Sequence, residues 1–548
     1  MKPPDTPEQS NQSKISKSSL RSEVRRNSHQ YHQDKIEDPQ ATIDRYKHKL
    51  RKHSLSWHLL LILPSFGWLL CRQLGLIETE RKTNQAKYWL LPILVGGVIW
   101  LLPTPTGVNE QAWHLLAIFL ATVVAFITKP MPMGAVAIMA LTISVVSNTL
   151  TIEQGLSGFS DKTAWLTLSS FLIARAIIKT GLATRTAYIF ITIFGKSTLL
   201  LSYGLLITDI VLSPVMPSGN ARGGGVIFPI VKSLATAYDS EPDDGKRKIG
   251  SFLMITAYQG TQITTALFLT AMVANPLMAQ LAKEIAGVDI DWLTWALAAL
   301  LPGIISLLMM PLIVYWFYPP QLKSTPKAPE FAKDKLKQIG EIKHSEWIML
   351  GILIVLLLLW GGGEQWGIES VTTALIGIVL LLITKVLTWK DIVREQEAWD
   401  IFVWFSILLM MATFLSQFGF IDWVSSEIGS AIKNLWWQAA FTCLSLVYFY
   451  SNYFFASKAA RAGAMYPAFL SVAISLGTPP MYAALVLAFL VNLSGCLTHY
   501  GTAVAPIYFG AGYVDAATWC KLGFYLSLAY LIIWAVIGGF WWRLLGFI

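Results

Sequence analysis

Apolar segments of bilayer length recur along the chain from Trp89 to the C-terminus, and they constrain the fold more than any other feature of the sequence. A helix needs about 20 predominantly apolar residues to cross the hydrocarbon core of a membrane. The composition agrees, because 54% of the residues are hydrophobic and 14% are charged, whereas soluble domains carry roughly 25% charged residues. The sequence therefore predicts an all-α integral membrane protein.

The length rule predicts about eleven transmembrane helices. We expect them at residues 87–103, 110–128, 131–148, 163–180, 250–278, 292–318, 346–361, 370–388, 400–418, 480–505 and 521–545.

The part of the chain before the first span is polar or only partly apolar. Residues 1–55 are rich in Ser, Gln, Lys and Arg and show no apolar period, so we expect a disordered basic tail in the cytoplasm. Residues 56–86 hold a short apolar stretch followed by charges, which predicts an interfacial helix and a linker. Residues 87–148 and 346–388 are interpreted as scaffold helices.

Two further apolar segments, at 198–238 and 436–476, are interrupted in the middle by small and polar residues. The interruptions read Pro217-Ser218-Gly219-Asn220 and Ala456-Ser457-Lys458-Ala459. Backbone that is broken at membrane depth must be buried in protein or line a cavity. We therefore predict two re-entrant helical hairpins.

The two interruptions belong to an internal repeat. Both spell S-x-x-A-R-x-G, from Ser218 and from Ser457, and 457 minus 218 places them 239 residues apart. A series of matches at nearly one offset indicates duplication, here of residues 163–318 and 400–548. The further matches are Ala174 to Gly181 with Ala412 to Gly419, Thr270 to Pro276 with Thr502 to Pro506, and Val288-Asp289 with Val514-Asp515.

Charge predicts that the repeats are inverted. The first repeat has Lys179 and Arg185 near one loop and Lys246 to Lys248 after its hairpin, whereas the equivalent places of the second repeat are poor in Lys and Arg. Basic loops stay in the cytoplasm. The two repeats then face opposite ways, with the N-terminus of the protein inside.

Inverted repeats with discontinuous helices are typical of secondary transporters, whose site lies near the bilayer midplane. Helix N-termini hold carboxylates, and free C-terminal carbonyls suit Na⁺. Two tips that meet from opposite sides could hold both ends of a dianion. Other classes fit less well: the spans contain no H-E-x-x-H, no G-x-S-x-G and no pair of acids for an enzyme, and no ring of charge for a channel. The main alternative is a carrier of an inorganic divalent anion or oxyanion with the same architecture.

The chain also resembles the divalent anion:sodium symporter family, and most closely its bacterial citrate/dicarboxylate carriers and plastid 2-oxoglutarate/malate translocators. The resemblance covers residue 87 to the end. The motifs that carry it are WHLLAIF from Trp113, KPMPMGA from Lys129, SGFS from Ser157, IKTGL from Ile178, PSGNARGGGVIFP from Pro217, TAMVANP from Thr270, LTHY from Leu497 and YFGAGYVD from Tyr508.

The resemblance implies a set of binding residues. In the family a Ser-Asn-Thr triplet at each tip binds substrate carboxylates and helps frame Na⁺. The matching positions here are Ser218, Gly219, Asn220, Ser457, Lys458 and Ala459, and both triplets depart from the pattern after the Ser. The family's second layer is formed by the unwound parts of the helices after each hairpin. It falls here on Thr264, Thr265, Thr270, Asn275, Thr498, Thr502 and Pro506, and Na⁺, the one possible coupling ion, on sites near Ser218, Thr270 and Ser457.

Four further side chains are assigned roles from chemistry. Lys458 is a costly intramembrane cation; it either replaces Na⁺ or pairs with a substrate carboxylate, or it reaches towards water. Arg222 and Arg461 lie about one turn after each tip Ser and are predicted to support the hairpins, with carboxylate binding as the alternative. His499 either lines the site as a neutral side chain or takes part in coupling.

The predicted partners are a small dicarboxylate and the lipid bilayer. The net charge of +9 comes mainly from the tail and loops, so it is interpreted as membrane topology rather than nucleic-acid binding. No cofactor is expected apart from Na⁺. The family resemblance implies a homodimer in a bacterial plasma membrane, or alternatively in a plastid inner envelope.

Overall fold

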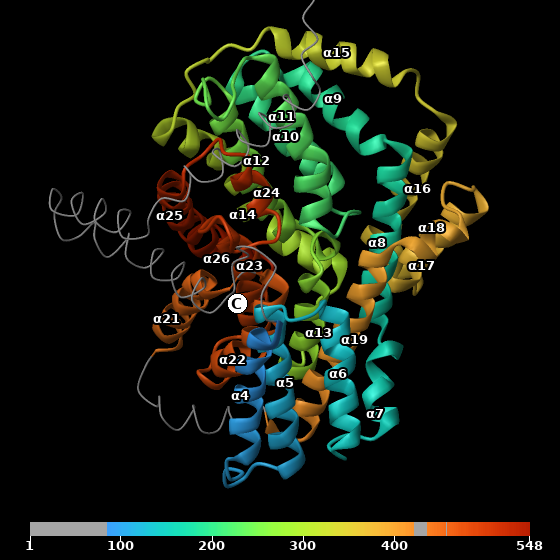
Figure 1. The fold of residues 1–548 in the computed structure, drawn as a ribbon, viewed down its shortest axis with the longest axis vertical. Coiled ribbons are helices and arrows are strands. Elements are labelled where there is room, and N and C mark those ends of the chain that lie inside the picture. The colour runs from blue at the N-terminus through green and yellow to red at the C-terminus, as the bar shows by residue number, and fades with distance from the viewer. Residues whose placement is uncertain (1–84, 421–422, 424–435, 456) are drawn as a thin grey trace, which may run out of the picture. The chain divides into compact units, whose positions relative to one another are not determined.

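The computed structural model describes residues 85–420, 423, 436–455 and 457–548. Within these residues nearly all regular structure is helical, and the β pairing consists of two isolated bridges. The predicted all-α class is therefore confirmed (Figure 1). The predicted tail and most of the interfacial segment, residues 1–84, lie outside the described residues.

The N-terminal helices come before the first interrupted segment. They are α4 (Gln85–Leu101), α5 (Glu110–Thr128), α6 (Met133–Val146), α7 (Ile152–Leu156), α8 (Lys162–Thr180) and α9 (Leu182–Phe194). Helix α9 is not among the predicted spans, and it bends by 64° from α8 at Gly181. Gly181 has a φ of +84°, a left-handed conformation that glycine adopts without steric cost.

Each repeat contains the same order of broken helices. In the first repeat they are α10 (Thr198–Leu212), the π-helical η2 (Asn220–Ile227), α11 (Phe228–Ala237), α12 (Gly250–Leu267), α13 (Ala274–Ala286) and α14 (Trp292–Phe317). In the second they are α21 (Trp437–Tyr450), α22 (Lys458–Ser475), α23 (Pro480–Leu493), α24 (Ala505–Gly510), α25 (Ala516–Ile532) and α26 (Gly539–Leu544).

The two spans predicted after the hairpins are not continuous helices, as the family resemblance implies. The segment 250–278 is two helices, α12 and α13, separated around a short 3₁₀ turn at Leu269–Ala271. The segment 480–505 ends its long helix at Leu493, and α24 begins only at Ala505. Apolar composition runs through both breaks, so hydropathy does not reveal them. By length and composition, five of the described helices can cross a membrane, or six if α8 and α9 are one bent span.

The last repeat match shifts by two residues. Asp291 accepts a hydrogen bond from Thr294 N at 2.8 Å and caps α14, just as Asp515 accepts one from Thr518 N at 2.9 Å and caps α25. Asp289, which the sequence aligned with Asp515, instead pairs with Lys283 at 2.7 Å. The two repeats therefore align better with Asp291 opposite Asp515, so that both D-x-x-T motifs match. A capping side chain must reach the free N–H groups of the first turn, and both of these Asp residues do so.

Four helices join the repeats. They are α15 (Lys327–Ile339), α16 (His344–Gly362), α17 (Ser370–Ile383) and α18 (Trp389–Arg394), and α19 (Gln396–Gln417) then begins the second repeat. The buried Arg185 of α9 holds this connection. It makes two contacts with Glu346 and donates to the carbonyls of Gly340 and Glu341 at 3.0 and 3.1 Å. The turn between α15 and α16 is therefore fixed to α9.

Candidate functional site

The first tip is the turn that follows the break after α10. Ser218 Oγ accepts a hydrogen bond from Ala221 N at 3.2 Å, which satisfies one of the free N–H groups at the start of the next helical segment. Ser218 is buried, whereas Gly219 and Asn220 are half-buried. This tip therefore ends in a helix N-terminus with little side-chain bulk around it.

The second tip has the same local design. Ser457 is the N-cap of α22, and its Oγ accepts from Ala460 N at 3.3 Å. Lys458 follows it and is buried, with 8% of its surface exposed. The equivalent place in the first tip, 239 residues earlier, is Gly219. The second tip thus carries an ammonium group that the first one lacks.

Thr265, in α12 of the first repeat, bonds the second tip and lies close to the first. Lys458 Nζ donates to Thr265 Oγ1 at 3.3 Å. A Cβ added to Gly219 would lie 3.5 Å from Thr265 Cγ2. Both tips therefore lie near the side chain of Thr265, and the shared substrate site stays a prediction.

Amide groups stabilise the break in α12. Asn275 Nδ2 donates to the carbonyls of Thr265 and Phe268 at 2.8 and 3.0 Å, and Asn492 Nδ2 donates to Asn275 Oδ1 at 2.8 Å. Carbonyls freed from a broken helix inside a membrane need such partners. Asn275 therefore supports the backbone around Thr265, and Asn492 connects it to the second repeat.

The break in α23 is held in the same way by side chains of α12. Tyr258 Oη donates to Gly495 O at 2.6 Å and Gln259 Nε2 to Cys496 O at 3.1 Å. Gly495 is packed so closely that an added Cβ would lie 2.4 Å from Gln262 Oε1 and 2.7 Å from Lys458 Cε. A larger residue there would displace the ends of the Gln262 and Lys458 side chains.

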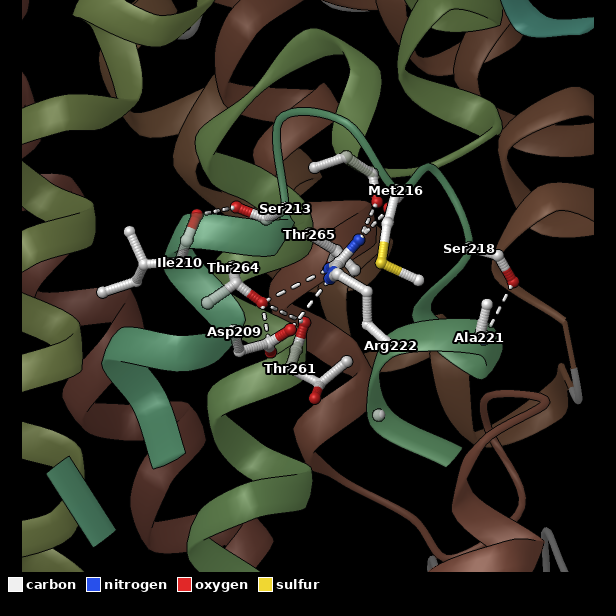
Figure 2. A network of polar contacts seen from close by, with 12 residues as sticks. Asp209, Ile210, Ser213, Met216, Ser218, Ala221, Arg222, Thr261, Thr264 and Thr265 are labelled. Atoms are coloured by element: carbon white, nitrogen blue, oxygen red, sulfur yellow. Dashed lines mark hydrogen bonds and ion pairs between the residues drawn. The ribbon is translucent and has the colours of Figure 1, made fainter. Parts of the chain in front are cut away.

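Arg222 is the centre of a buried network behind the first tip (Figure 2). Its Nε donates to Asp209 Oδ1 at 2.8 Å, and its terminal nitrogens bond the carbonyls of Met216 and Ala271 and the hydroxyl of Thr264. Thr264 Oγ1 in turn donates to Asp209 Oδ2 at 2.7 Å. The guanidinium of Arg222 therefore donates its hydrogen bonds to groups of the protein itself. Thr264 belongs to this network rather than to the tip.

Arg461, at the matching position of the second repeat, has different partners. Its nitrogens approach the carbonyls of Tyr448, Phe449 and Leu490 at 3.3–3.4 Å and the hydroxyl of Ser494 at 2.6 Å. Its guanidinium carbon lies 5.2 Å from the ring centroid of Tyr448, in cation–π range. Within the described parts of the chain no carboxylate pairs with Arg461 or with Lys458.

The remaining predicted residues lie at varying depths. Thr498 and Thr502 are buried beside the break in α23, and Thr498 Oγ1 has no hydrogen-bond partner among the described residues. His499 packs against Phe509 with ring centroids 4.2 Å apart and the rings tilted by 32°. Pro506 is exposed in the first turn of α24, and Tyr508 Oη of the same turn donates to Gly223 O of η2 at 2.8 Å. Ala459 is half-buried next to Lys458.

The predicted Na⁺ position near Thr270 fits poorly. Thr270 Oγ1 donates to Pro214 O and accepts from Trp292 Nε1 at 3.0 Å, so one lone pair is left for an ion. At the second tip the ammonium of Lys458 already supplies positive charge. The described residues contain no cluster of three or more His, Cys, Asp or Glu side chains that could hold a metal ion.

Sequence reasoning missed Glu397. Ser218 Oγ lies 3.4 Å from Glu397 Oε1, so an acidic residue at the start of α19 reaches the first tip. The two residues are 179 positions apart, and nothing in either local pattern connects them. Gln262, whose Oε1 is buried without a partner among the residues described, was missed for the same reason.

Two repeats of broken helices, with polar tips that lie near the same buried threonine, define a membrane transport protein rather than an enzyme. Residues 83–548 match the family described as "Sodium:sulfate symporter transmembrane region". The chain belongs to this family, which confirms the resemblance to divalent anion:sodium symporters inferred from the motifs.

Curated relatives match over most of their own length. "Putative malate transporter YflS" of Bacillus subtilis is 50% identical over 458 residues, which are 83% of this chain and 96% of the relative. "Dicarboxylate transporter 1, chloroplastic" of Spinacia oleracea is 48% identical over 460 residues, 83% of this chain and 81% of the relative. "Citrate/succinate antiporter" of Escherichia coli is 34% identical over 473 residues, 82% and 97% of the two chains.

Solved structures share the fold at low sequence identity. The Alcanivorax borkumensis YdaH transporter superposes with a TM-score of 0.52 at 12% identity, covering 83% of this chain and 97% of its own. MtrF of Neisseria gonorrhoeae superposes with a TM-score of 0.51 at 14% identity, covering 86% and 97%. These likenesses support the architecture alone.

Proposed function

We propose that this protein is a secondary active carrier of small dicarboxylates of the 2-oxoglutarate, malate and succinate class. The proposal rests above all on Lys458, a buried ammonium at the N-terminus of α22 that reaches Thr265 beside the first tip. A helix N-terminus and an ammonium both favour carboxylate. Alternating access around the two tips would carry the anion across the membrane.

The relatives support the same substrate class. Their names specify malate, dicarboxylates and citrate/succinate, and the alignments cover 81–97% of their chains. Residues common to the whole transport region, rather than one short motif, therefore underlie the similarity.

We further propose exchange of dicarboxylates that does not require Na⁺. The side chain of Lys458 can supply positive charge at the second tip, and the hydroxyl of Thr270 has little capacity left for an ion. A positive charge carried by the protein itself requires no Na⁺ gradient. A Na⁺ symporter would instead need free oxygen ligands at these positions.

An inorganic divalent anion is the alternative substrate, because the family description itself specifies sulfate. Sulfate and malate both carry two negative charges, but malate places them at opposite ends of a carbon chain. Two tips that both lie near Thr265 suit two separated carboxylates better than one compact anion.

Counterflow in proteoliposomes tests the proposal. Vesicles loaded with unlabelled malate should accumulate labelled malate from outside, equally in sodium and in potassium buffers, and succinate or 2-oxoglutarate should compete. Saturable uptake of sulfate that malate does not reduce would support the alternative. Malate uptake that stops without Na⁺ would overturn the exchange mechanism but keep the substrate class.

We also propose a homodimer in the bacterial plasma membrane with its N-terminus in the cytoplasm. The distribution of Lys and Arg supports the orientation. Light scattering of the detergent-solubilised protein would test the dimer, and a periplasm-sensitive reporter fused to residue 1 would test the orientation.

A further inference from the structure

A carboxylate of the protein itself lies at the first tip. Glu397 Oε1 is 3.4 Å from Ser218 Oγ, and the side chain of Glu397 is exposed at the start of α19. Ser218 Oγ already accepts a hydrogen bond from Ala221 N at 3.2 Å. A hydroxyl has one hydrogen to donate, and an ionised carboxylate only accepts. Ser218 therefore donates its hydrogen to Glu397, and a substrate carboxylate would need that same hydrogen.

The other acids at the start of α19 are directed elsewhere. Glu395 pairs with Arg175 at 3.4 Å. Asp400 Oδ1 accepts a hydrogen bond from Gly134 N at 3.2 Å. Among the ion pairs of the described residues, none involves Glu397. The charge of Glu397 is therefore the one that this helix start directs towards the tip.

The two tips differ in the sign of the charge beside them. At the first tip, Arg222 is fully buried and pairs with Asp209, so its guanidinium does not balance Glu397. At the second tip, Lys458 stands where the first tip has Gly219. An anion held between the tips would thus be attracted at one end and repelled at the other.

This arrangement bears on how many charges a ligand can carry. The electrostatic energy between a fixed charge and a ligand is proportional to the charge of the ligand. Attraction by Lys458 alone would favour the ligand with the most negative charges. A limit on that number requires a second, repulsive group, and specific sites often combine both kinds of contact.

We propose that Glu397 is a specificity-determining residue, which limits the substrate to two negative charges by repelling the third carboxylate of a tricarboxylate. The inference rests on the proposed function and deepens it. Because the side chain of Glu397 is exposed, it can turn aside and release the hydrogen of Ser218 to one substrate carboxylate. It then stays close enough to oppose a further carboxylate at the same end.

Glu397→Gln tests the inference, because it removes the charge but keeps the size of the side chain and an acceptor for Ser218. The ligands are monomethyl succinate, succinate and propane-1,2,3-tricarboxylate, which is succinate with an added carboxymethyl group. At about pH 8 their carboxyl groups are ionised, so they form a series of a monoanion, a dianion and a trianion. Each competes with labelled malate for uptake into malate-loaded proteoliposomes.

The expected result is a graded one. Glu397→Gln should strengthen inhibition by the tricarboxylate relative to inhibition by the monoester by about tenfold or more, with succinate in between. Asp400→Asn is the matched control, because it removes an acid one turn further along α19 whose carboxylate bonds Gly134 instead. It should leave the ratios between the three ligands close to those of the unaltered protein.

Glu397→Ala removes the same charge together with the side chain, so it serves if the Gln variant does not fold. It should shift the ratios in the same direction. An equal change for all three ligands, or ratios that match those of Asp400→Asn, would overturn the inference.

The unaltered protein, measured in the same vesicles, separates this inference from the proposed function. If it exchanges no malate, the proposed function fails. If it exchanges malate but neither Glu397 variant gains affinity for the tricarboxylate relative to succinate, the function stands and the role of Glu397 is wrong.

Discussion

The ammonium of Lys458 lies 3.3 Å from the hydroxyl of Thr265, so that a residue of the second tip is directly bonded to the broken helix of the first repeat. This contact crosses 193 positions of sequence. It places a cation where both tips can reach a common ligand. It also leaves the ammonium with two more hydrogens to donate to an anion.

Replacing Lys458 with Met should therefore weaken dicarboxylate binding. A hydrogen bond to a charged group contributes about 1.5–3 kcal/mol, which corresponds to roughly a 10- to 100-fold loss in affinity. Thermal-shift titration with malate would measure it. Lys196→Met is the matched control, because Lys196 is an exposed loop residue. Equal malate affinity in the two variants would show that Lys458 does not contribute to malate binding.

The ion pair of Asp209 and Arg222 should be a major source of stability. Both side chains are buried, and removal of one partner leaves the other unpaired. Asp209→Asn is expected to destabilise the protein by about 3–5 kcal/mol. Asp334→Asn should change stability by less than about 1 kcal/mol, because its pair with Lys337 is exposed.

A double substitution distinguishes pairing from simple packing at the same position. Asp209→Leu with Arg222→Met removes both charges, so it should be more stable than Asp209→Asn alone. Thermal unfolding in detergent, followed by tryptophan fluorescence, gives the order of stabilities. A double variant less stable than the single one would show that the polar contacts, and not the buried charge, dominate.

The sequence predicted the tips well because their signal is local. Each tip is a short run of small and polar residues inside an apolar segment, and the S-x-x-A-R-x-G repeat marks both. Hydropathy alone predicts continuous spans through the helix breaks after Leu267 and Leu493, because apolar residues continue through them, whereas the family resemblance implies unwound parts in both helices. What makes these breaks possible is a set of distant bonds, such as those from Asn275 and Tyr258.

The partners of the two arginines show the same limit. The motif predicted that Arg222 and Arg461 support the hairpins, and the structure shows both bonded to backbone carbonyls. The ion pair of Asp209 could have been predicted from the sequence, because an acidic residue within an apolar membrane segment requires a partner. The approach of Glu397 to Ser218 could not, because it depends on how two helices 179 residues apart pack together.

Gly495 packs against the ends of two long side chains. An alanine Cβ would lie 2.4 Å from Gln262 Oε1 and 2.7 Å from Lys458 Cε, so both side chains must shift. Because this shift displaces the ammonium of Lys458, Gly495→Ala is expected to reduce malate exchange. Gly510→Ala is the control, because no other group lies within 4 Å of its added Cβ. Similar exchange rates in both alanine variants would contradict the close packing.

The pair of Asp391 and Lys179 gives a prediction on pH dependence outside the membrane-spanning segments. Hydrogen bonds from Lys179, at 2.7 Å, and from Thr388 hold the pKa of Asp391 well below its ordinary value. A carboxylate with a lowered pKa stabilises the folded state above its unfolded pKa of about 3.9, and the contribution is lost as the pH falls through the lower folded value. The unaltered protein should thus be more stable than Asp391→Asn at pH 7, and the difference should shrink below about pH 4.

Thermal unfolding of both proteins between pH 3 and pH 8 measures this difference. It should stay constant from pH 8 down to about pH 5, because Asp391 is ionised in both the folded and unfolded states over that range. Asp289→Asn is a useful comparison, since its carboxylate pairs with Lys283 but is 75% exposed, so solvent screens the pair. A stability difference for Asp391→Asn that grew as the pH fell would mean that the pair with Lys179 does not favour the ionised carboxylate.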